Sequence, residues 1–242
     1  MDALIYTLMS GAERALRSQQ LHANNLANLD TPGFRADLEL ATSEAVTTGY
    51  GYDARHMSRL QANSVASREG SVRETGRDLD VAIAGQGYFT VQWQDTEAYS
   101  RAGTFAIDEN GALTLNGHAV IGDGGPIALP PHSRLEIGDD GTISIQAPGQ
   151  ADLAPIDRLK LVRPEPDEVT KNTGGFIVAR AGGTLPADES VKVRGGYLEG
   201  SNVSAIEEMV ATMNLNREFE IQMKLYRAAD AMAESGNRLV RE

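Results

Sequence analysis

The chain of 242 residues contains no cysteine, and only 5% of its residues are aromatic. Without cysteine there are no disulfide bonds, no thiolate metal sites and no cysteine nucleophiles. The histidines are scattered, and no two of them have the spacing of paired metal ligands. The sequence therefore predicts no metal site and no cofactor. The histidines are His22, His56, His118 and His132.

Sequence patterns typical of enzymes are also missing. There is no Gly-x-Ser-x-Gly elbow, and no glycine-rich stretch has the Gly-Lys-Ser/Thr ending of a phosphate loop. The acidic clusters at 108–111 and 139–141 lack the spacing of a calcium loop, so we interpret them as hairpin turns. Acidic pairs such as Glu207-Glu208 lie on an expected helix with no implied cleft. We therefore expect no catalytic residue and no enzymatic activity.

No targeting or membrane-spanning segment is evident. Residues 1–12 lack a basic region and include Asp2, so no secretory signal peptide is predicted. The longest apolar run is too short for a transmembrane segment. The formal net charge of −12 argues against nucleic acid as a partner. A cytoplasmic location and export without a cleaved signal are both compatible with these features.

Proline and glycine are scarce at the two ends of the chain. All nine prolines lie in the middle, and only two of the 25 glycines, Gly11 and Gly236, fall within residues 1–29 or 204–242. The ends are therefore suited to helix and the middle to turns. The middle holds 25 acidic and 15 basic residues, whereas the ends are nearly neutral. Near-neutral helices can associate without like-charge repulsion.

An amphipathic helix is predicted from the start of the chain, and it ends in a corner. Its apolar residues recur at helical spacings. Asparagines follow, which are poor helix formers and good turn formers. Thr31 precedes Pro32 and is therefore disfavoured in helical conformation, and Pro32-Gly33 turns the chain. The apolar positions are Ile5, Leu8, Ala12, Leu16, Ala23 and Leu26.

A second helix, long and free of proline, is predicted from about 201 to 241. Ser204 and Glu207 fit a capping box at its start, with Asn202 as a rival cap. Its apolar residues spread over more than one side, so it needs more than one neighbour. Two helices of one chain cannot supply that, but neighbouring subunits can. The apolar positions are Val203, Ile206, Met209, Val210, Met213, Ile221, Leu225, Met232 and Leu239, with Leu215, Phe219, Met223 and Tyr226 adding a second stripe.

The middle of the chain changes pattern twice. Residues 37–46 are expected to form a short helix, and residues 47–69 an extended, irregular segment. From residue 70 onward, short apolar runs alternate with turn signals, which indicates antiparallel strands. The expected turns lie at 85–87, 108–111, 116–117 and 139–141.

The predicted fold class is α+β, with long N- and C-terminal helices forming a coiled-coil domain around a central antiparallel β-rich domain. We expect three parts. Residues 1–33 with 200–242 form the discontinuous helical coiled-coil domain. Residues 34–69 form an extended linker or clamp with a short helix, and residues 70–199 form the β-rich outer domain.

Several stretches of the chain form a recognisable set of motifs. Near the N-terminus these are Asn24-Asn25-Leu26-Ala27-Asn28 and Pro32-Gly33-Phe34. Near the C-terminus they are Gly200-Ser201-Asn202-Val203, then Glu208-Met209 and Met213. The central motifs are Leu79-Asp80-Val81-Ala82-Ile83, Gly85-Gln86-Gly87-Tyr88-Phe89 and Tyr99-Ser100-Arg101-Ala102-Gly103-Thr104-Phe105. Together they resemble the flagellar rod and hook proteins, over nearly the whole chain and in the right order.

This resemblance implies a structural subunit of the bacterial flagellar basal-body rod, in its proximal part, that polymerises into a tube transmitting torque. The implied partners are other axial proteins of the proximal and distal rod, copies of the chain itself, and the flagellar export apparatus. The implied location is the periplasmic rod, reached without a cleaved signal peptide. Two alternatives stay open: a distal-rod or hook-type axial protein, and a soluble β-rich carbohydrate-binding or enzymatic module.

Two sets of residues are expected to carry the assembly. The first is an interface between subunits, formed by Ile5, Leu8, Leu16, Leu26, Val203, Ile206, Val210, Met213 and Ile221. The second is the corner of the family motif, formed by Asn24, Asn25, Leu26, Asn28, Pro32, Gly33 and Phe34. Neither set implies nucleic acid as a partner.

Overall fold

The computed structural model describes the backbone of residues 2–45 and 56–241. It describes their side chains except those of 2–6, 39–45, 56–63, 237 and 239–241. Within these residues the chain divides into two units. The helical unit comprises residues 2–27, 37–45, 56–63 and 204–241, and the β unit comprises residues 28–36 and 64–203.

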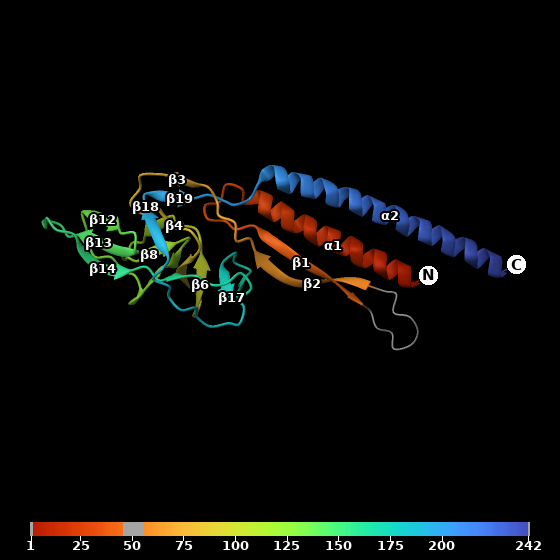
Figure 1. Cartoon of the computed structure of the whole chain (residues 1–242), viewed down its shortest axis with the longest axis horizontal. Helices are drawn as coiled ribbons and strands as arrows, with labels where there is room; N and C mark the ends of the chain where they lie inside the picture. Colours follow the sequence, from red (N-terminus) through yellow and green to blue (C-terminus); the bar gives the residue numbers. More distant parts are fainter. Residues whose placement is uncertain (1, 46–55, 242) are drawn as a thin grey trace. The chain divides into compact units, whose positions relative to one another are not determined.

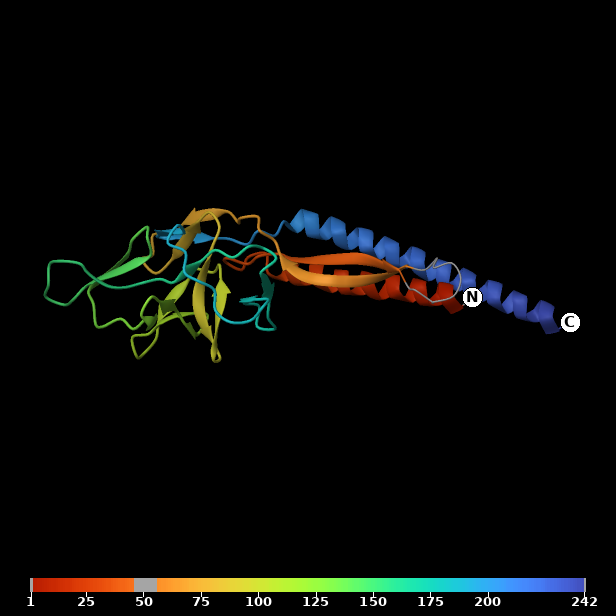
Figure 2. The same ribbon diagram turned by 60° about the horizontal axis from the view of Figure 1, so that its bottom comes forward.

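Two helices and one pair of strands build the helical unit (Figure 1). Helix α1 (Asp2–Ala27) and helix α2 (Ala205–Arg241) lie side by side and antiparallel in both views (Figure 1, Figure 2). Strands β1 (Asp37–Ala45) and β2 (His56–Val65) form a two-stranded sheet, and β1 contacts α1. Both termini of the described chain therefore belong to this unit.

The start of α2 agrees with the predicted cap. The Ser204 hydroxyl accepts a hydrogen bond of 3.4 Å from the Glu207 N–H, and its carbonyl accepts one of 3.0 Å from the Glu208 N–H. The acidic residues of this first turn interact favourably with the positive end of the helix dipole.

The prediction of a coiled-coil domain is wrong. The two helices differ in length, with 26 and 37 residues, and they share their unit with β1 and β2. Val210 and Met213 on α2 are 49% and 51% exposed, so these apolar side chains are not enclosed between the two helices. A polar pair, His22 with Glu208, meets between the helices instead. The helix pair therefore lacks the unbroken apolar seam that a coiled coil needs.

The predicted short helix at 37–46 is also wrong, because residues 37–45 form strand β1. The irregular segment expected at 47–69 contains strand β2 at 56–65, and residues 46–55 of these predictions lie outside the described part. Acidic residues and leucines alternate over Asp37–Leu40, which is the period of a strand. Pairing between β1 and β2 satisfies the backbone groups that an isolated helical turn would leave open.

The β unit contains short strands in several small sheets, and every strand pair with a defined register is antiparallel, as predicted. The largest sheet has the order β15-β5-β6-β17-β16; the others are β12-β13-β14, β7-β8-β9, β10-β11, β18-β4 and β19-β3. Their bounds are β3 (Val72–Glu74), β4 (Val81–Ala84), β5 (Tyr88–Trp93), β6 (Thr96–Ser100), β7 (Phe105–Ile107), β8 (Leu113–Leu115), β9 (His118–Ala119), β10 (Ile121–Gly122), β11 (Gly125–Pro126), β12 (Arg134–Ile137), β13 (Thr142–Gln146), β14 (Ala154–Arg158), β15 (Leu161–Val162), β16 (Val169–Lys171), β17 (Ile177–Ala179), β18 (Lys192–Gly195) and β19 (Tyr197–Glu199).

A large hydrophobic cluster connects several of these sheets, and a second, smaller cluster includes Tyr99, Val162 and Ile177 of the largest sheet. Phe89 and Phe105 are fully buried and meet edge to face, with ring centroids 5.1 Å apart. Val81, Leu113 and Ile143, from three different sheets, belong to the same cluster. The β unit therefore has the buried apolar surface expected of an independent folding unit. In the described part of the chain, neither helix is long and apolar enough to span a membrane.

Candidate assembly surface and the buried ion cluster

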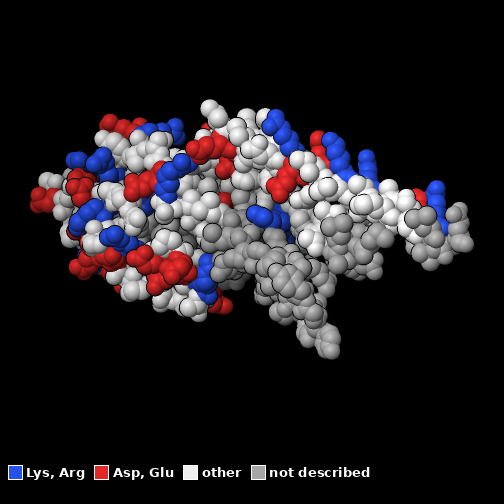
Figure 3. Space-filling view, turned by 45° about the vertical axis from the view of Figure 1, so that its right-hand side comes forward, with Lys and Arg blue, Asp and Glu red and all other residues white. Residues whose placement is uncertain are grey.

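A row of apolar side chains runs along α2 on the side turned away from α1. Glu208 contacts α1, and Val210 lies two residues further, about 200° around the helix. In Figure 3 the charged side chains along α2 stand apart, with uncharged surface between them. The exposed fractions of the row lie between 49% and 77%. This α2 stripe consists of Ile206, Met209, Val210, Met213, Ile221, Leu225 and Met232.

The structure splits the predicted interface residues into groups. On α1, Leu16 is 48% exposed, whereas Leu8 and Leu26 are half-buried. The backbone of Ile5 lies in α1, and its side chain falls outside the described part. Val203 is buried in the β unit, just before α2. Only four of the predicted residues share the α2 stripe: Ile206, Val210, Met213 and Ile221.

A groove with a volume of about 200 Å³ lies between α1 and α2. Gly11 permits close approach here, because a Cβ atom at this position would lie only 3.0 Å from Gln222 Nε2. Tyr226 is 36% exposed, so the groove opens to solvent on the surface of the helical unit. Its lining residues are Leu8, Met9, Ala12, Gln222, Met223 and Tyr226.

Asn25 is the buried asparagine of the predicted corner, with 1% of its surface exposed. Its side-chain oxygen accepts a hydrogen bond of 2.9 Å from the Asp37 N–H, and its amide donates to the Asp37 carbonyl at 3.2 Å. The same amide donates to Glu208 Oε1 at 3.3 Å. Asn25 therefore pairs with the first residue of β1 as a neighbouring strand would, and ties it to the start of α2.

The rest of the corner lies mainly in the β unit. Gly33 has a φ of 67°, and a Cβ there would lie 2.2 Å from the Ala102 backbone nitrogen, so glycine is required. Lys171 Nζ lies 4.0 Å from the centroid of the Phe34 ring, a cation–π contact. Asn28 accepts a hydrogen bond from Thr31, Pro32 is half-buried, and Asn24 is an exposed residue of α1.

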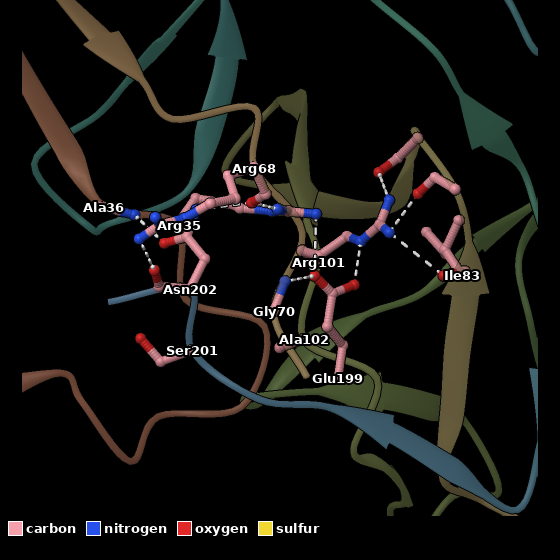
Figure 4. A network of polar contacts seen from close by, with 12 residues as sticks. Arg35, Ala36, Arg68, Gly70, Ile83, Arg101, Ala102, Glu199, Ser201 and Asn202 are labelled. Carbon is pink, nitrogen blue, oxygen red and sulfur yellow. Dashed lines mark hydrogen bonds and ion pairs between the residues drawn. The ribbon is translucent and has the colours of Figure 1, made fainter. Parts of the chain in front are cut away.

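A buried ion cluster follows the corner (Figure 4). Arg35, Arg101 and Glu199 are each less than 5% exposed. Arg35 Nη2 lies 2.9 Å from Glu199 Oε1, and Arg101 Nε lies 2.5 Å from Glu199 Oε2. Arg101 also donates to the carbonyls of Gly87 at 2.6 Å and Ile83 at 3.2 Å. We call these three charged residues the Glu199 cluster.

The Glu199 cluster contains two guanidinium groups and one carboxylate. Burial lowers the pKa of Arg35, an effect that the negative charge of Glu199 opposes and the positive charge of Arg101 adds to. Burial also raises the pKa of the neighbouring Tyr88 phenol. Backbone carbonyls around Arg101 compensate part of the positive charge. Such a cluster is stable only while all three charged partners are present.

The histidine and acidic side chains that could have formed a metal or catalytic site make structural contacts instead. The His118 ring lies among aromatic rings, with centroids 4.8 Å from Trp93 and 5.0 Å from Phe176. Asp140 accepts hydrogen bonds from Thr142, as expected for a hairpin turn. No group of three or more histidine, aspartate or glutamate side chains in the described part could hold a metal ion.

Comparison with known proteins shows which family shares this arrangement. A model described as "Flagella basal body rod protein" matches residues 5–35, one described as "Flagellar hook protein FlgE/F/G D1 domain" matches 82–145, and one described as "Flagellar basal body rod FlgEFG protein C-terminal" matches 194–239. The flagellar basal-body rod protein FlgF of Salmonella typhimurium is 39% identical over 99% of both chains. The chain belongs to the family of flagellar basal-body rod proteins. The resemblance read from the sequence is thereby confirmed.

Other rod proteins of this family agree. FlgF of Escherichia coli K12 is 39% identical over 99% of both chains. FlgG of Buchnera aphidicola subsp. Schizaphis graminum is 31% identical, over 94% of this chain and 97% of the relative. This rod protein is therefore a structural subunit of the flagellar basal body, and its family assembles with other axial proteins.

Sequence reasoning missed the Glu199 cluster as a functional element. Each of the three matched family segments contributes one member: Arg35 from the first, Arg101 from the second and Glu199 from the third. The available signal was position, since Arg35 directly follows Gly33-Phe34 and Glu199 directly precedes Gly200-Ser201. Nothing in the linear order showed that the three charges meet.

Proposed function

We propose that this rod protein is a proximal-rod subunit, which polymerises with copies of itself and other axial proteins into a tube that transmits torque. The two relatives with 39% identity are both named FlgF, and they support this position over the distal-rod alternative. Other FlgF proteins are 26–28% identical and one FlgG protein is 31% identical, so the support comes from those two relatives. The function is mechanical continuity, and it requires neither a catalytic group nor a cofactor.

The α2 stripe is the observation that carries this proposal. Seven large apolar side chains, each at least 49% exposed on one helix, form a surface that a monomer gains nothing by exposing. A neighbouring subunit that covers the stripe would remove it from water. Head-to-tail contacts between unlike surfaces produce an open helical polymer when the rotation does not close a ring.

We expect the flagellar export apparatus to deliver the chain without a cleaved signal peptide to the periplasmic part of the rod. The family membership supports this route. Complementation of a strain lacking its own FlgF would test the position: rescue there, without rescue of a strain lacking FlgG, is the expected result.

A single charge introduced into the α2 stripe tests whether the stripe is an interface between subunits. Val210→Asp or Met213→Asp should leave the melting temperature of the soluble chain nearly unchanged, because substitutions at exposed positions usually change stability by less than about 0.5 kcal/mol. In the assembled rod the same charge would be unpaired in an apolar contact, which costs several kcal/mol. Motility and the yield of rods should be lost. Calorimetry of the purified variants and motility of cells carrying them are the measurements.

Asn216→Asp is the matched control, because it adds the same charge at an exposed position of the same helix on the side that faces α1, and keeps the oxygen that accepts a hydrogen bond from Gln19 Nε2. It should preserve both melting temperature and motility. A fall of many degrees in the melting temperature of the Val210 variant would place the stripe in an intramolecular core. Normal motility of both stripe variants would show that the stripe is not an interface.

A further inference from the structure

The chain passes between its two units at four points: 27–28, 36–37, 63–64 and 203–204. On the side of the β unit, these points belong to three short stretches, residues 28–36, 64–71 and 199–203. We call these stretches the root segments. Any force that travels along the backbone from one unit to the other must enter the β unit through them.

The first and third root segments are joined by backbone and side-chain hydrogen bonds. The Gly33 N–H donates to the Glu199 carbonyl at 2.8 Å. Asn202 makes two of these bonds. Its N–H donates to the Phe34 carbonyl at 3.2 Å, and its Oδ1 accepts from the Ala36 N–H at 2.7 Å. Asn202 is 6% exposed, so water does not compete for these bonds.

Asn202 and Glu199 also join the second and third root segments. Asn202 Nδ2 donates to the Arg68 carbonyl at 2.7 Å, and Arg68 Nη2 returns a bond of 3.0 Å to the Asn202 carbonyl. Glu199 Oε1 accepts from the Gly70 N–H at 2.8 Å. Figure 4 shows both side chains pointing between the segments they connect.

The first and second root segments are also joined by direct hydrogen bonds. The Ala66 N–H donates to the Ala36 carbonyl at 2.9 Å, and the Arg35 guanidinium donates to the Arg68 carbonyl. Each pair of root segments is therefore linked directly. Arg101 then fixes Glu199 to the carbonyls around strand β4, so the linked segments are anchored in the body of the β unit.

We propose that the root segments form the junction through which force enters the β unit along the backbone, and that Asn202 and Glu199 are the positioning residues that hold the three segments together. Because each segment is bonded to both others, a load arriving on one segment is shared by all three. Forced opening is governed by the rate of local rupture, which rises when one link is lost. The proposal rests on the proposed function in one respect, that torque passes through this subunit.

The test removes the Asn202 side chain and varies the load. Asn202→Ala deletes the side-chain bonds to the Ala36 N–H and the Arg68 carbonyl, keeps the backbone bonds of residue 202, and leaves the Glu199 cluster intact. Cells carrying it should build rods and rotate at low load. In viscous medium they should lose flagella at least about tenfold more often than wild type, because the loss of one buried hydrogen bond accounts for about a tenfold change in rate and two are lost. The count of flagella broken at the basal body, at each viscosity, is the measurement.

The matched control is a core substitution of equal thermal cost outside the root segments. Ile143→Val or Ile143→Ala, whichever lowers the melting temperature of the soluble chain as much as Asn202→Ala, serves because Ile143 is fully buried in strand β13. The control should show no load dependence. If the two variants lose flagella equally often at every viscosity, the proposed junction is wrong. If the wild-type chain builds no rods in the complemented strain even at low load, the proposed function fails instead.

A measurement on the soluble chain keeps the proposal testable if Asn202→Ala fails to assemble. The chain has no cysteine, so Ala27→Cys and Ile206→Cys give two unique attachment points, one just outside each outer root segment on the side of the helical unit. Pulling between them loads the junction directly. Asn202→Ala should lower the rupture force of the first event, and the Ile143 control should leave it unchanged. An unchanged rupture force in the Asn202 variant overturns the proposal.

Discussion

Glu199 shows how a single buried charge can define the geometry of several chain segments. Its two carboxylate oxygens bind Arg35, Arg101 and the Gly70 N–H, which lie between 98 and 164 positions before it in the sequence. Replacing such a group by an apolar one of similar size can be neutral, but removing one partner leaves the others charged and unpaired. Its effect on stability is therefore best tested by neutralising the carboxylate alone.

We expect Glu199→Gln to destabilise the β unit by about 3–5 kcal/mol, the range for breaking a buried ion pair on one side. The amide keeps the shape of the side chain but leaves Arg35 and Arg101 without a negative partner. Urea denaturation followed by Trp93 fluorescence measures the change, because Trp93 is the only tryptophan and lies in β5.

Glu136→Gln is the control for this substitution. Glu136 pairs with Arg134 at 3.5 Å, and both side chains are more than half exposed. An exposed pair of this kind contributes about 0–1 kcal/mol. If Glu199→Gln lowers the free energy of unfolding no more than Glu136→Gln does, the Glu199 cluster contributes no more to stability than an exposed ion pair.

At the scale of elements, local chemistry made some parts predictable. The turns at 108–111 and 139–141 do connect paired strands, β7 with β8 and β12 with β13. Asn116 and Gly117, with φ of 51° and 81°, turn the chain between β8 and β9. Both long helices are present. In each case residues close in sequence decide the conformation, so a sequence pattern is sufficient.

Elements that depend on distant partners were not predictable in this way. Strand β4 is followed by the turn at 85–87, but it pairs with β18 rather than with β5. Strand β1 depends on β2 and on Asn25, and neither dependence is visible in its own nine residues. The periodicity of α2 showed that it has apolar faces. It did not show that α1 lies against the polar side at Glu208.

The role of Asn25 gives a prediction for β1. Asn25→Ala removes both side-chain bonds to the half-buried Asp37, a loss of about 1–3 kcal/mol at about 0.5–1.5 kcal/mol per bond. Because those bonds lie at the start of β1, the loss should be local. Hydrogen exchange should become faster in β1 and at the start of α2, while exchange in the β unit core stays as in the wild type.

Asn24→Ala is the control for this substitution. It removes the same side-chain atoms from the neighbouring residue of the motif, which is exposed on α1. It should not accelerate exchange in β1. Equal acceleration in both variants would indicate that the end of α1, rather than the pairing of Asn25 with Asp37, limits the opening of β1.

For the whole molecule, the two units differ in how much apolar surface they bury. The described hydrophobic residues buried in the helical unit are two alanines, Ala15 and Ala229. The β unit buries large side chains such as Phe89, Phe105 and Leu113 completely. Burial of apolar area is the main term that offsets the entropy of ordering the chain. The helical unit of an isolated subunit is therefore the less stable of the two.

This difference predicts two separate unfolding transitions for the soluble chain. Both described helices belong to the helical unit, so ellipticity at the helical wavelength reports on it, while Trp93 fluorescence reports on the β unit. In urea, the helical signal should be lost first, with midpoints at least about 1 M apart given typical denaturant slopes.

Assembly should raise the first midpoint, because covering the α2 stripe adds buried apolar area only to the helical unit. Coincident transitions by both probes would show instead that the helices unfold together with the β unit. The exposed stripe would then not mark a unit that depends on neighbouring subunits for its stability.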